Sequence, residues 1–264
     1  MNLAGIDPDS TPDFTEGKKA GERALAENAA EFAELQEKLF AESRFGGTRS
    51  VLLVLQAMDT AGKGGIVEHV LGLANPQGIQ AYSFKAPTDE EKAHDFLWRI
   101  RKQLPAAGHI GVFDRSHYED VLIHRVRGFS APEVIEERYG LIRSFEEEVI
   151  AAGTTIVKVM LHISPEEQKE RLASRLEDPT KHWKYNPGDV DERGYWDAYM
   201  EAYEIAIERT STDTAPWHVV PANHKWYARL TVQRLLLEAL RSLDLQWPAA
   251  TYDVELEKKR LADS

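Results

Sequence analysis

The sequence predicts an α/β protein with a five-stranded parallel sheet, and three observations support this fold class. Short apolar segments alternate with amphipathic helical segments, as in parallel strands joined by helical crossovers. Residues Val51–Leu55 are all apolar, which is typical of a strand buried on both faces. Ser164, Pro165 and Glu167 mark a helix start directly after an apolar segment. The expected strands lie at residues 51–55, 81–84, 110–113, 154–163 and 217–220.

The bulk composition excludes several classes of protein. The chain has 264 residues and a mass of 29.9 kDa, enough for one large core. It has no cysteine, which excludes disulfides and thiolate catalysis. Its net charge of -12 argues against a nucleic-acid partner but leaves room for a local basic groove. No apolar run approaches the roughly 20 residues that span a bilayer, and the first residues do not resemble a signal peptide. We therefore expect no membrane partner and a cytoplasmic location.

Four further segments have a clear pattern. Residues 1–15 contain two prolines and several acidic residues, which predicts a mobile or surface-tethered arm. Helical spacing of apolar residues predicts one packing helix within residues 16–42. Thr88 followed by Glu91 predicts a capping box that opens a helix extending to about residue 104. A packing helix is expected at 227–243, followed by a surface tail.

A partial phosphate loop follows the first strand. Residues 57–64 fit the pattern G-x-x-x-x-G-K-[ST] at two of its four fixed positions, Gly62 and Lys63. In such a loop the backbone N–H groups hold phosphate and the lysine reaches the outer phosphates. Ala57 replaces the first glycine, and Gly64 stands where a hydroxyl normally binds magnesium, so Asp59 is the nearest candidate ligand. The phosphate-binding residues are expected to be Ala61, Gly62, Lys63, Gly64 and Gly65.

A second acidic position follows the third strand. Asp114 ends an apolar strand, which is the Walker B pattern and places a carboxylate beside the phosphate loop at the carboxyl edge of the sheet. Arg115 adds a cation at the same edge. Glu119 is either a further site residue or an acidic residue that favours the first turn of a helix. The sequence thus predicts that Asp59 and Asp114 hold magnesium, while His117 has no assigned role.

Cations gather after the fourth strand. Arg171 and Arg175 are four residues apart and share one face of the expected helix, and Lys181 and Lys184 follow beside aromatic residues. Arginine here can neutralise a transferring phosphoryl group. The structural alternative is a solvated helix in which Glu167 pairs with Arg171. The loop after the fifth strand, Asn223–Lys225, also lies at the ligand edge and could contact a nucleotide.

Taken together, these motifs resemble the polyphosphate kinase 2 family. The resemblance covers about Ser50 to Leu240 and rests on five stretches in order: LQAMDTAGKGG, SFKAPTDEEKAHDFLWRI, GVFDRSHYEDVL, LHISPEEQKERLASRLEDPTKHWKYNPGD and APWHVVPANHKWYARL. It implies a P-loop kinase-like three-layer sandwich with a helical lid. The implied division is an N-terminal arm and helix at 1–48, a catalytic domain at 49–250 with the lid at about 171–210, and a tail at 251–264.

The resemblance also implies an activity. It implies reversible phosphoryl transfer between inorganic polyphosphate and nucleoside mono- or diphosphates, with Mg²⁺ and in a homo-oligomer. Family members often have Asn where this chain has Asp114; either side chain offers an oxygen to a metal ion. The resemblance marks the following positions in this chain: Asp59, Gly62, Lys63, Asp114, Arg115, Glu119, Arg171 and Arg175.

Two other functions remain open at this point. An ATP-dependent kinase for a nucleotide or small metabolite would share the loop, the carboxylate and the arginines. A nucleotide-sensing protein without turnover would lack the catalytic cations, which are present here.

Overall fold

The computed structural model describes residues 1–264 and contains one five-stranded sheet in which every pair of neighbouring strands is parallel. The spatial order is β2-β3-β1-β4-β5. The strands are β1 (Ser50–Ala57), β2 (Ile79–Ser83), β3 (Ile110–Asp114), β4 (Thr154–His162) and β5 (Trp217–Pro221). Leu55 of β1 pairs in register with Asp114 of β3. The α/β fold class and the five strands predicted from sequence are therefore confirmed.

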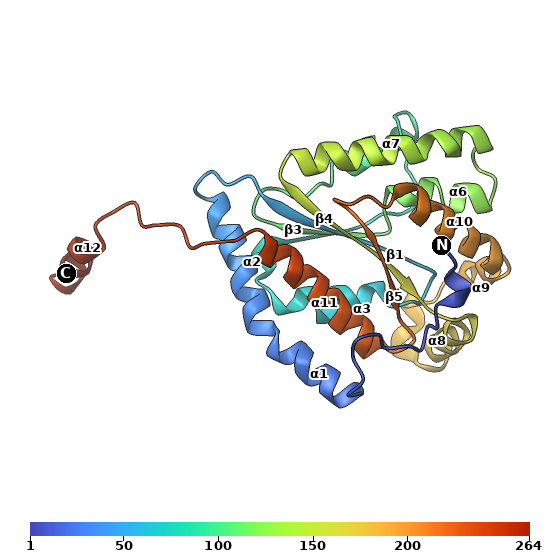
Figure 1. Ribbon diagram of the computed structural model, residues 1–264, viewed down its shortest axis with the longest axis horizontal. Helices are drawn as coiled ribbons and strands as arrows, with labels where there is room; N and C mark the ends of the chain where they lie inside the picture. Colours follow the sequence, from blue (N-terminus) through green and yellow to red (C-terminus); the bar gives the residue numbers. More distant parts are fainter.

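Helices cover both faces of the sheet and make three layers (Figure 1). One face carries α1 (Lys18–Glu27), α2 (Ala29–Ser43), α3 (Lys63–His69) and α11 (Lys225–Ser242). The other carries α6 (Ile123–Val126), α7 (Pro132–Ala151) and α10 (Trp196–Thr210). Each face has its own apolar core, one around Leu53 and the other around Phe113. This layering follows from β1, whose eight residues are all buried, because a strand in the middle of a parallel sheet needs cover on both sides.

The remaining helices are short or lie at the ends of the sheet. At the carboxyl end, α8 (Pro165–Glu177) begins with Ser164 accepting a hydrogen bond from Glu167, as the sequence predicts. The others are α4 (Asp89–Lys92), α5 (Trp98–Arg101), α9 (Gly188–Arg193), α12 (Val254–Ala262) and the 3-10 helices η1 (Leu3–Gly5), η2 (Leu71–Leu73), η3 (Pro76–Gly78), η4 (His117–Asp120) and η5 (Pro179–Lys184). None of the helices combines the length and apolar character that crossing a membrane requires.

Two expected helices are interrupted. The single helix predicted within residues 16–42 is wrong, since it is divided into α1 and α2 at Asn28. Gln233 donates to the carbonyl of Leu25, the group that would accept from Ala29 in a continuous helix. The helix predicted from residue 88 to 104 is also divided, into α4 and α5. The capping box at Thr88 is present, but Asp95 accepts a hydrogen bond from the backbone of Leu97, and this local turn breaks the helix.

The N-terminal arm is tethered across the carboxyl end of the sheet. Leu3 is fully buried in the core beneath α10, whereas Phe14 packs into the core on the α11 side. Between them, the carbonyl of Pro8 accepts a hydrogen bond from Asn223 and that of Pro12 accepts one from Tyr227. The C-terminal tail behaves differently, because α12 extends away from the body of the molecule (Figure 1). Its residues are at the surface, as the sequence suggests, but they form a helix.

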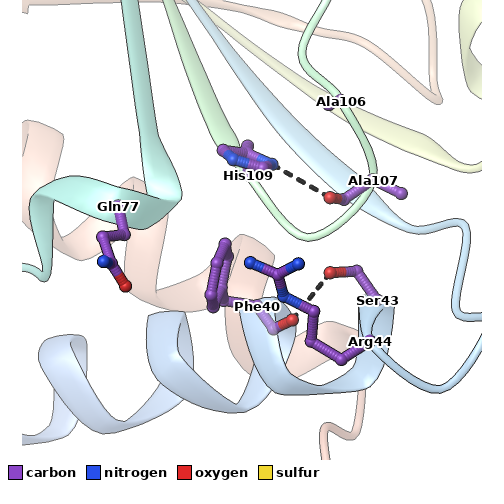
Figure 2. A pocket seen from close by; sticks show the side chains of 7 residues that line it. All are labelled: Phe40, Ser43, Arg44, Gln77, Ala106, Ala107 and His109. Carbon is purple, nitrogen blue, oxygen red and sulfur yellow. Dashed lines mark hydrogen bonds between the residues drawn. The ribbon is translucent and has the colours of Figure 1, made fainter.

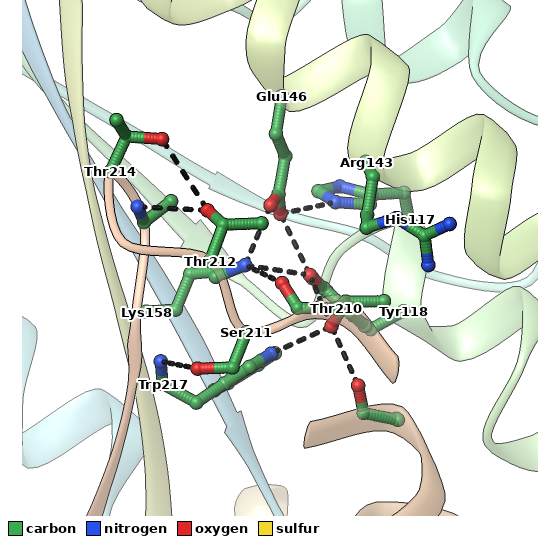
Figure 3. A network of polar contacts seen from close by, with 12 residues as sticks. His117, Tyr118, Arg143, Glu146, Lys158, Thr210, Ser211, Thr212, Thr214 and Trp217 are labelled. Atoms are coloured by element: carbon green, nitrogen blue, oxygen red, sulfur yellow. Dashed lines mark hydrogen bonds and ion pairs between the residues drawn. The ribbon is translucent and has the colours of Figure 1, made fainter. Parts of the chain in front are cut away.

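A buried polar network lies under α7 and accounts for His117 (Figure 3). The Lys158 ammonium is 2.6 Å from the Glu146 carboxylate, and the Tyr118 hydroxyl donates to the same carboxylate at 2.7 Å. The Nε2 atom of His117 is 3.4 Å from Glu146. Thr210 joins this network to the end of α10. His117 is thus a buried partner of Glu146.

Candidate functional site

A cleft of about 830 Å³ opens at the carboxyl end of the sheet, where the phosphate loop, β3 and the segment after α8 meet. Its basic residues are Lys63, Lys85, Arg115, Arg175, Lys181, Lys184, Lys225 and Arg229, and its acidic residues are Asp59, Glu68 and Asp114. Eight cations against three carboxylates make this a basic site in a chain whose net charge is -12. The cleft is the local basic groove that the composition left room for.

The phosphate loop has the conformation that an anion cradle needs. Gly62 has φ of 118° and caps the start of α3, a left-handed conformation that favours glycine. Thr60 has φ of 67°, which is strained for a β-branched residue. The first hydrogen bond within α3 runs from Ile66 to the carbonyl of Gly62, so the N–H groups of Lys63, Gly64 and Gly65 have no partner in the helix. The loop therefore presents free donors to the cleft.

The loop has a glycine, Gly64, where the usual pattern has a serine or threonine hydroxyl. A side chain at Gly64 would meet no atom within 4 Å. This position is therefore open, and no hydroxyl is present there to bind a metal ion. Lys63 lines the cleft, and its ammonium donates to the carbonyl of Ala57 at 3.2 Å.

Acidic and basic side chains alternate around the end of β3. The Arg115 guanidinium donates to the Asp59 carboxylate at 2.7 Å. Arg115 has φ of 62° and its backbone N–H binds the carbonyl of Leu55 at 3.1 Å, so this strained turn is fixed to the neighbouring strand. Burial alone would lower the pKa of Arg115, but Glu119 and Asp59 raise it, so the guanidinium stays charged. Burial raises the pKa of Glu119, against the effect of Arg115 and Lys63. Glu119 is half-buried and does not line the cleft.

Asp59 and Asp114 fit a magnesium site that is completed by substrate. Both line the cleft, and the Asp114 carboxylate makes no hydrogen bond or ion pair with the protein. No group of three or more acidic or histidine side chains is arranged to hold a metal ion by itself. Magnesium is usually bound by one or two carboxylates together with phosphate oxygens and water, so two carboxylates in a phosphate-binding cleft are a suitable donor set.

The cations at the end of α8 and on η5 lie on the wall of the cleft. Arg175 lines the cleft, donates to the carbonyl of Lys184 at 2.8 Å and lies 3.5 Å from the Asp189 carboxylate. Burial raises the pKa of Asp189, as does the charge of Asp59, while Arg175 opposes both. Lys181 and Lys184 line the same cleft. Three of the four cations predicted after the fourth strand thus line the cleft.

Arg171 has a different position from the other three. Its guanidinium is buried and donates to four backbone carbonyls, those of Thr60, Ala61, Ala222 and Asn223. It also pairs with Glu167 at 2.5 Å, the pairing that the structural alternative anticipates. Gln168 adds a hydrogen bond to the carbonyl of Asp59. Arg171 therefore braces the phosphate loop and ties it to the loop after β5. It does not line the 830 Å³ cleft but lines a smaller cavity beside it; direct contact of Arg171 with phosphate stays a prediction.

Replacing Arg171 by lysine should reduce kcat/KM by about 100-fold. A lysine keeps the charge but cannot donate to four carbonyls on two loops. The phosphate loop would then shift, and small displacements of reacting groups reduce the reaction rate strongly. The measurement is steady-state kinetics beside a thermal unfolding curve. Arg101→Lys is the matched control, since Arg101 is an exposed arginine paired with Glu148 far from the cleft. A kcat/KM for Arg171→Lys within twofold of the parent would contradict the bracing role.

Sequence reasoning missed two cations on the cleft. Lys85 follows β2, and Arg229 lies four residues after Lys225 on α11. Both positions could have been predicted. Lys85 follows a parallel strand, and the carboxyl ends of parallel strands meet at one edge. Arg229 is four residues from Lys225, and residues four apart share a helix face. Of the loop Asn223–Lys225, only Lys225 lines the cleft, and burial lowers its pKa, with Arg171 acting in the same direction. Asn223 instead accepts a hydrogen bond from the backbone of Ser164.

A second cavity, of about 490 Å³, lies elsewhere and has a different character (Figure 2). It is formed by the end of α2 and the loop before β3. Its one arginine, Arg44, lies over the ring of Phe40, and His109 is bonded to the carbonyl of Ala107. It has neither a glycine loop nor a carboxylate among its lining residues, so this cavity lacks the phosphate-binding features of the basic cleft.

The fold and the cleft together define a P-loop kinase-like phosphotransferase: a parallel sheet, a glycine-lysine loop, an aspartate at the end of the neighbouring strand and a ring of cations. The family model described as Polyphosphate kinase 2 matches residues 15–247. The chain belongs to this family.

Individual relatives agree with this assignment. The AMP/ADP-polyphosphate phosphotransferase of Meiothermus ruber is 47% identical over 248 residues, which is 94% of this chain and 91% of that protein. The ADP-polyphosphate phosphotransferase of Rhodopseudomonas palustris is 41% identical, over 92% of this chain and 87% of that protein. The crystal structure of Polyphosphate Kinase 2 from Arthrobacter aurescens TC1 matches with a TM-score of 0.97 and 62% identity, covering 100% of this chain and 93% of that one.

Proposed function

We propose that this protein transfers a phosphoryl group between inorganic polyphosphate and AMP or ADP, in both directions. The observation that carries the proposal is the concentration of eight cations on one cleft beside the phosphate loop, in a chain of net charge -12. Both proposed substrates are polyanions that carry phosphate at the reacting end. The reaction therefore needs charge neutralisation and alignment more than covalent chemistry from the protein.

The cleft has room for two phosphate chains. A smaller cavity of about 380 Å³ adjoins it and shares Thr60, Arg175, Lys181, Lys184 and Lys225 with it. We place the nucleotide phosphates on the loop and the polyphosphate along the shared cations. Arg175 lines both cavities, so it is positioned to neutralise the phosphoryl group that passes between them.

Asp59 and Asp114 would hold Mg²⁺ against the phosphates. When bound, magnesium supplies charge neutralisation at the phosphate oxygens and fixes their orientation. Asp59 is paired with Arg115, which would then turn to the substrate phosphates that it can bind in a bidentate manner. Lys63 contacts the outer phosphates, and the N–H groups of Gly64 and Gly65 hold an oxygen. The acceptor phosphate oxygen attacks the donor phosphorus directly, and the remaining polyphosphate leaves shortened by one unit.

The experiment that tests the proposal supplies AMP or ADP with polyphosphate and magnesium and with no other phosphoryl donor. The expected products are ADP from AMP and ATP from ADP, and they should be absent with the variant Lys63→Ala. If nucleotide is converted only when ATP is added as donor, the protein is an ATP-dependent kinase and the proposal fails. GMP and GDP in parallel reactions report the base preference.

Two further expectations from the sequence stay predictions. Assembly into a homo-oligomer is implied by the family resemblance and can be measured by light scattering. The cytoplasmic location likewise stays a prediction.

A further inference from the structure

Trp183 is the one large aromatic side chain exposed on the wall of the basic cleft. The other apolar residues that line the cleft are all buried: Ala61, Ile66, Phe84, Leu161 and Ala228. Trp183 is 79% exposed. An indole ring gains from being covered by another apolar or aromatic group. Its position on a cleft wall, rather than on the outer surface, indicates that a ligand covers it.

The segment that carries Trp183 is firmly held. Asp178 caps η5 by accepting a hydrogen bond from the backbone of Thr180 at 3.0 Å. The carbonyl of Lys184 accepts from Arg175 at 2.8 Å, and His182 is bonded to the carbonyl of Leu176 at 2.9 Å. The residues on either side of Trp183 are therefore bonded to α8. The ring is presented by a defined turn.

Most of the indole is free of contact with the protein. The ammonium of Lys184 lies 4.9 Å from the centroid of the Trp183 ring. No aromatic ring or second cation of the protein lies against it. A flat aromatic group can stack on the exposed indole. Lys184 and Lys181 also line the cleft beside it, and Lys181 is paired with Asp178 at 2.8 Å.

We propose that Trp183 is the stacking platform for the nucleobase of the nucleotide substrate, an inference that rests on the proposed function. Polyphosphate has no ring to stack, so this contact distinguishes the nucleotide from the other polyanion in the cleft. Because every base has a π-face, the contact tolerates different bases, and purines gain more from it than pyrimidines because they are larger. Trp183 thus selects for a nucleotide and against a bare phosphate ester.

The test measures equilibrium binding of AMP and of ribose 5-phosphate by calorimetry, with magnesium and without polyphosphate. We expect Trp183→Ala to weaken AMP binding about tenfold. Trp183→Phe should keep most of the parent's affinity for AMP. Ribose 5-phosphate should bind to the parent and to Trp183→Ala with affinities that differ by less than twofold. In turnover, the KM for polyphosphate should be unchanged. Trp247→Ala is the matched control, because Trp247 is also exposed (51%) and has a lysine 5.9 Å from its ring, but lies outside the cleft.

Two results would overturn the proposal: AMP affinity within twofold of the parent in Trp183→Ala, or equal losses for AMP and ribose 5-phosphate, which would indicate a structural role. Binding is measured without a donor, so its outcome is separate from the proposed function. A protein that binds AMP through Trp183 but forms no ADP from polyphosphate would overturn the proposed function alone.

Discussion

Replacing Asp114 by alanine is expected to abolish phosphoryl transfer and to leave the fold intact. Asp114 lines the cleft with Asp59, and its carboxylate makes no hydrogen bond or ion pair with the protein, so its removal leaves no protein group unpaired. Loss of one of two magnesium ligands should lower kcat by about 1000-fold or more, in the range found when a group that stabilises transferring charge is removed. The measurement is ADP formation from AMP and polyphosphate, beside a thermal unfolding curve.

The variant Asp114→Asn separates metal binding from other roles. An amide oxygen still coordinates magnesium but carries no charge, so we expect activity that falls about tenfold and needs more magnesium for half-maximal rate. Raising the magnesium concentration should recover part of the activity of Asp114→Asn and none of that of Asp114→Ala. Activity of Asp114→Ala near that of the parent would remove the two-carboxylate metal site from the mechanism.

The parts of the site that could be predicted from sequence are those set by strand ends. The phosphate loop follows β1 and Asp114 ends β3, and these strands are neighbours in register. The carboxyl ends of parallel strands converge, so a glycine-lysine loop and a strand-terminal aspartate meet without any knowledge of the side-chain packing. The same rule predicts that Lys85, which follows β2, lies at this edge, and Lys85 does line the cleft.

The roles of the two arginines on α8 could not be separated from sequence. Arg171 and Arg175 are four residues apart on one helix face, yet Arg171 is buried against the phosphate loop and Arg175 lines the cleft. What separates them is the position of four backbone carbonyls, two of them in the loop after β5. Helical spacing predicts which face of the helix a residue occupies. It does not predict whether a neighbouring loop buries the side chain on that face.

Interruptions of helices were also beyond the sequence pattern. The apolar spacing of residues 16–42 is continuous, and the break at Asn28 comes from a glutamine on α11, more than 200 residues away. A hydrogen bond that a distant side chain donates to a helix carbonyl cannot be predicted from the sequence of the helix itself. Likewise, the sequence does not distinguish Glu146 from the other acidic residues of α7. The structure shows that Glu146 is paired with Lys158 of β4.

That pair gives the largest expected effect on stability. Glu146→Ala would leave the Lys158 ammonium, whose side chain is 0% exposed, without its counter-charge. It would also remove the nearer of two acceptors of the Tyr118 hydroxyl, leaving Thr210 (Figure 3). Breaking a buried pair on one side costs about 3–5 kcal/mol, which corresponds to a fall in melting temperature of about 10 °C for a chain of this size. Urea and thermal unfolding measure it.

A matched pair on the same helix isolates burial as the cause. Glu148 is paired with Arg101 at 2.7 Å, but both side chains are exposed, so Glu148→Ala should cost less than about 1 kcal/mol. The double variant Glu146→Met with Lys158→Met removes both charges from the interior and should be more stable than Glu146→Ala. If Glu146→Ala costs no more than Glu148→Ala, then Lys158 is neutral or solvated in the folded protein, and the network does not hold η4 and the end of α10 to the sheet by charge.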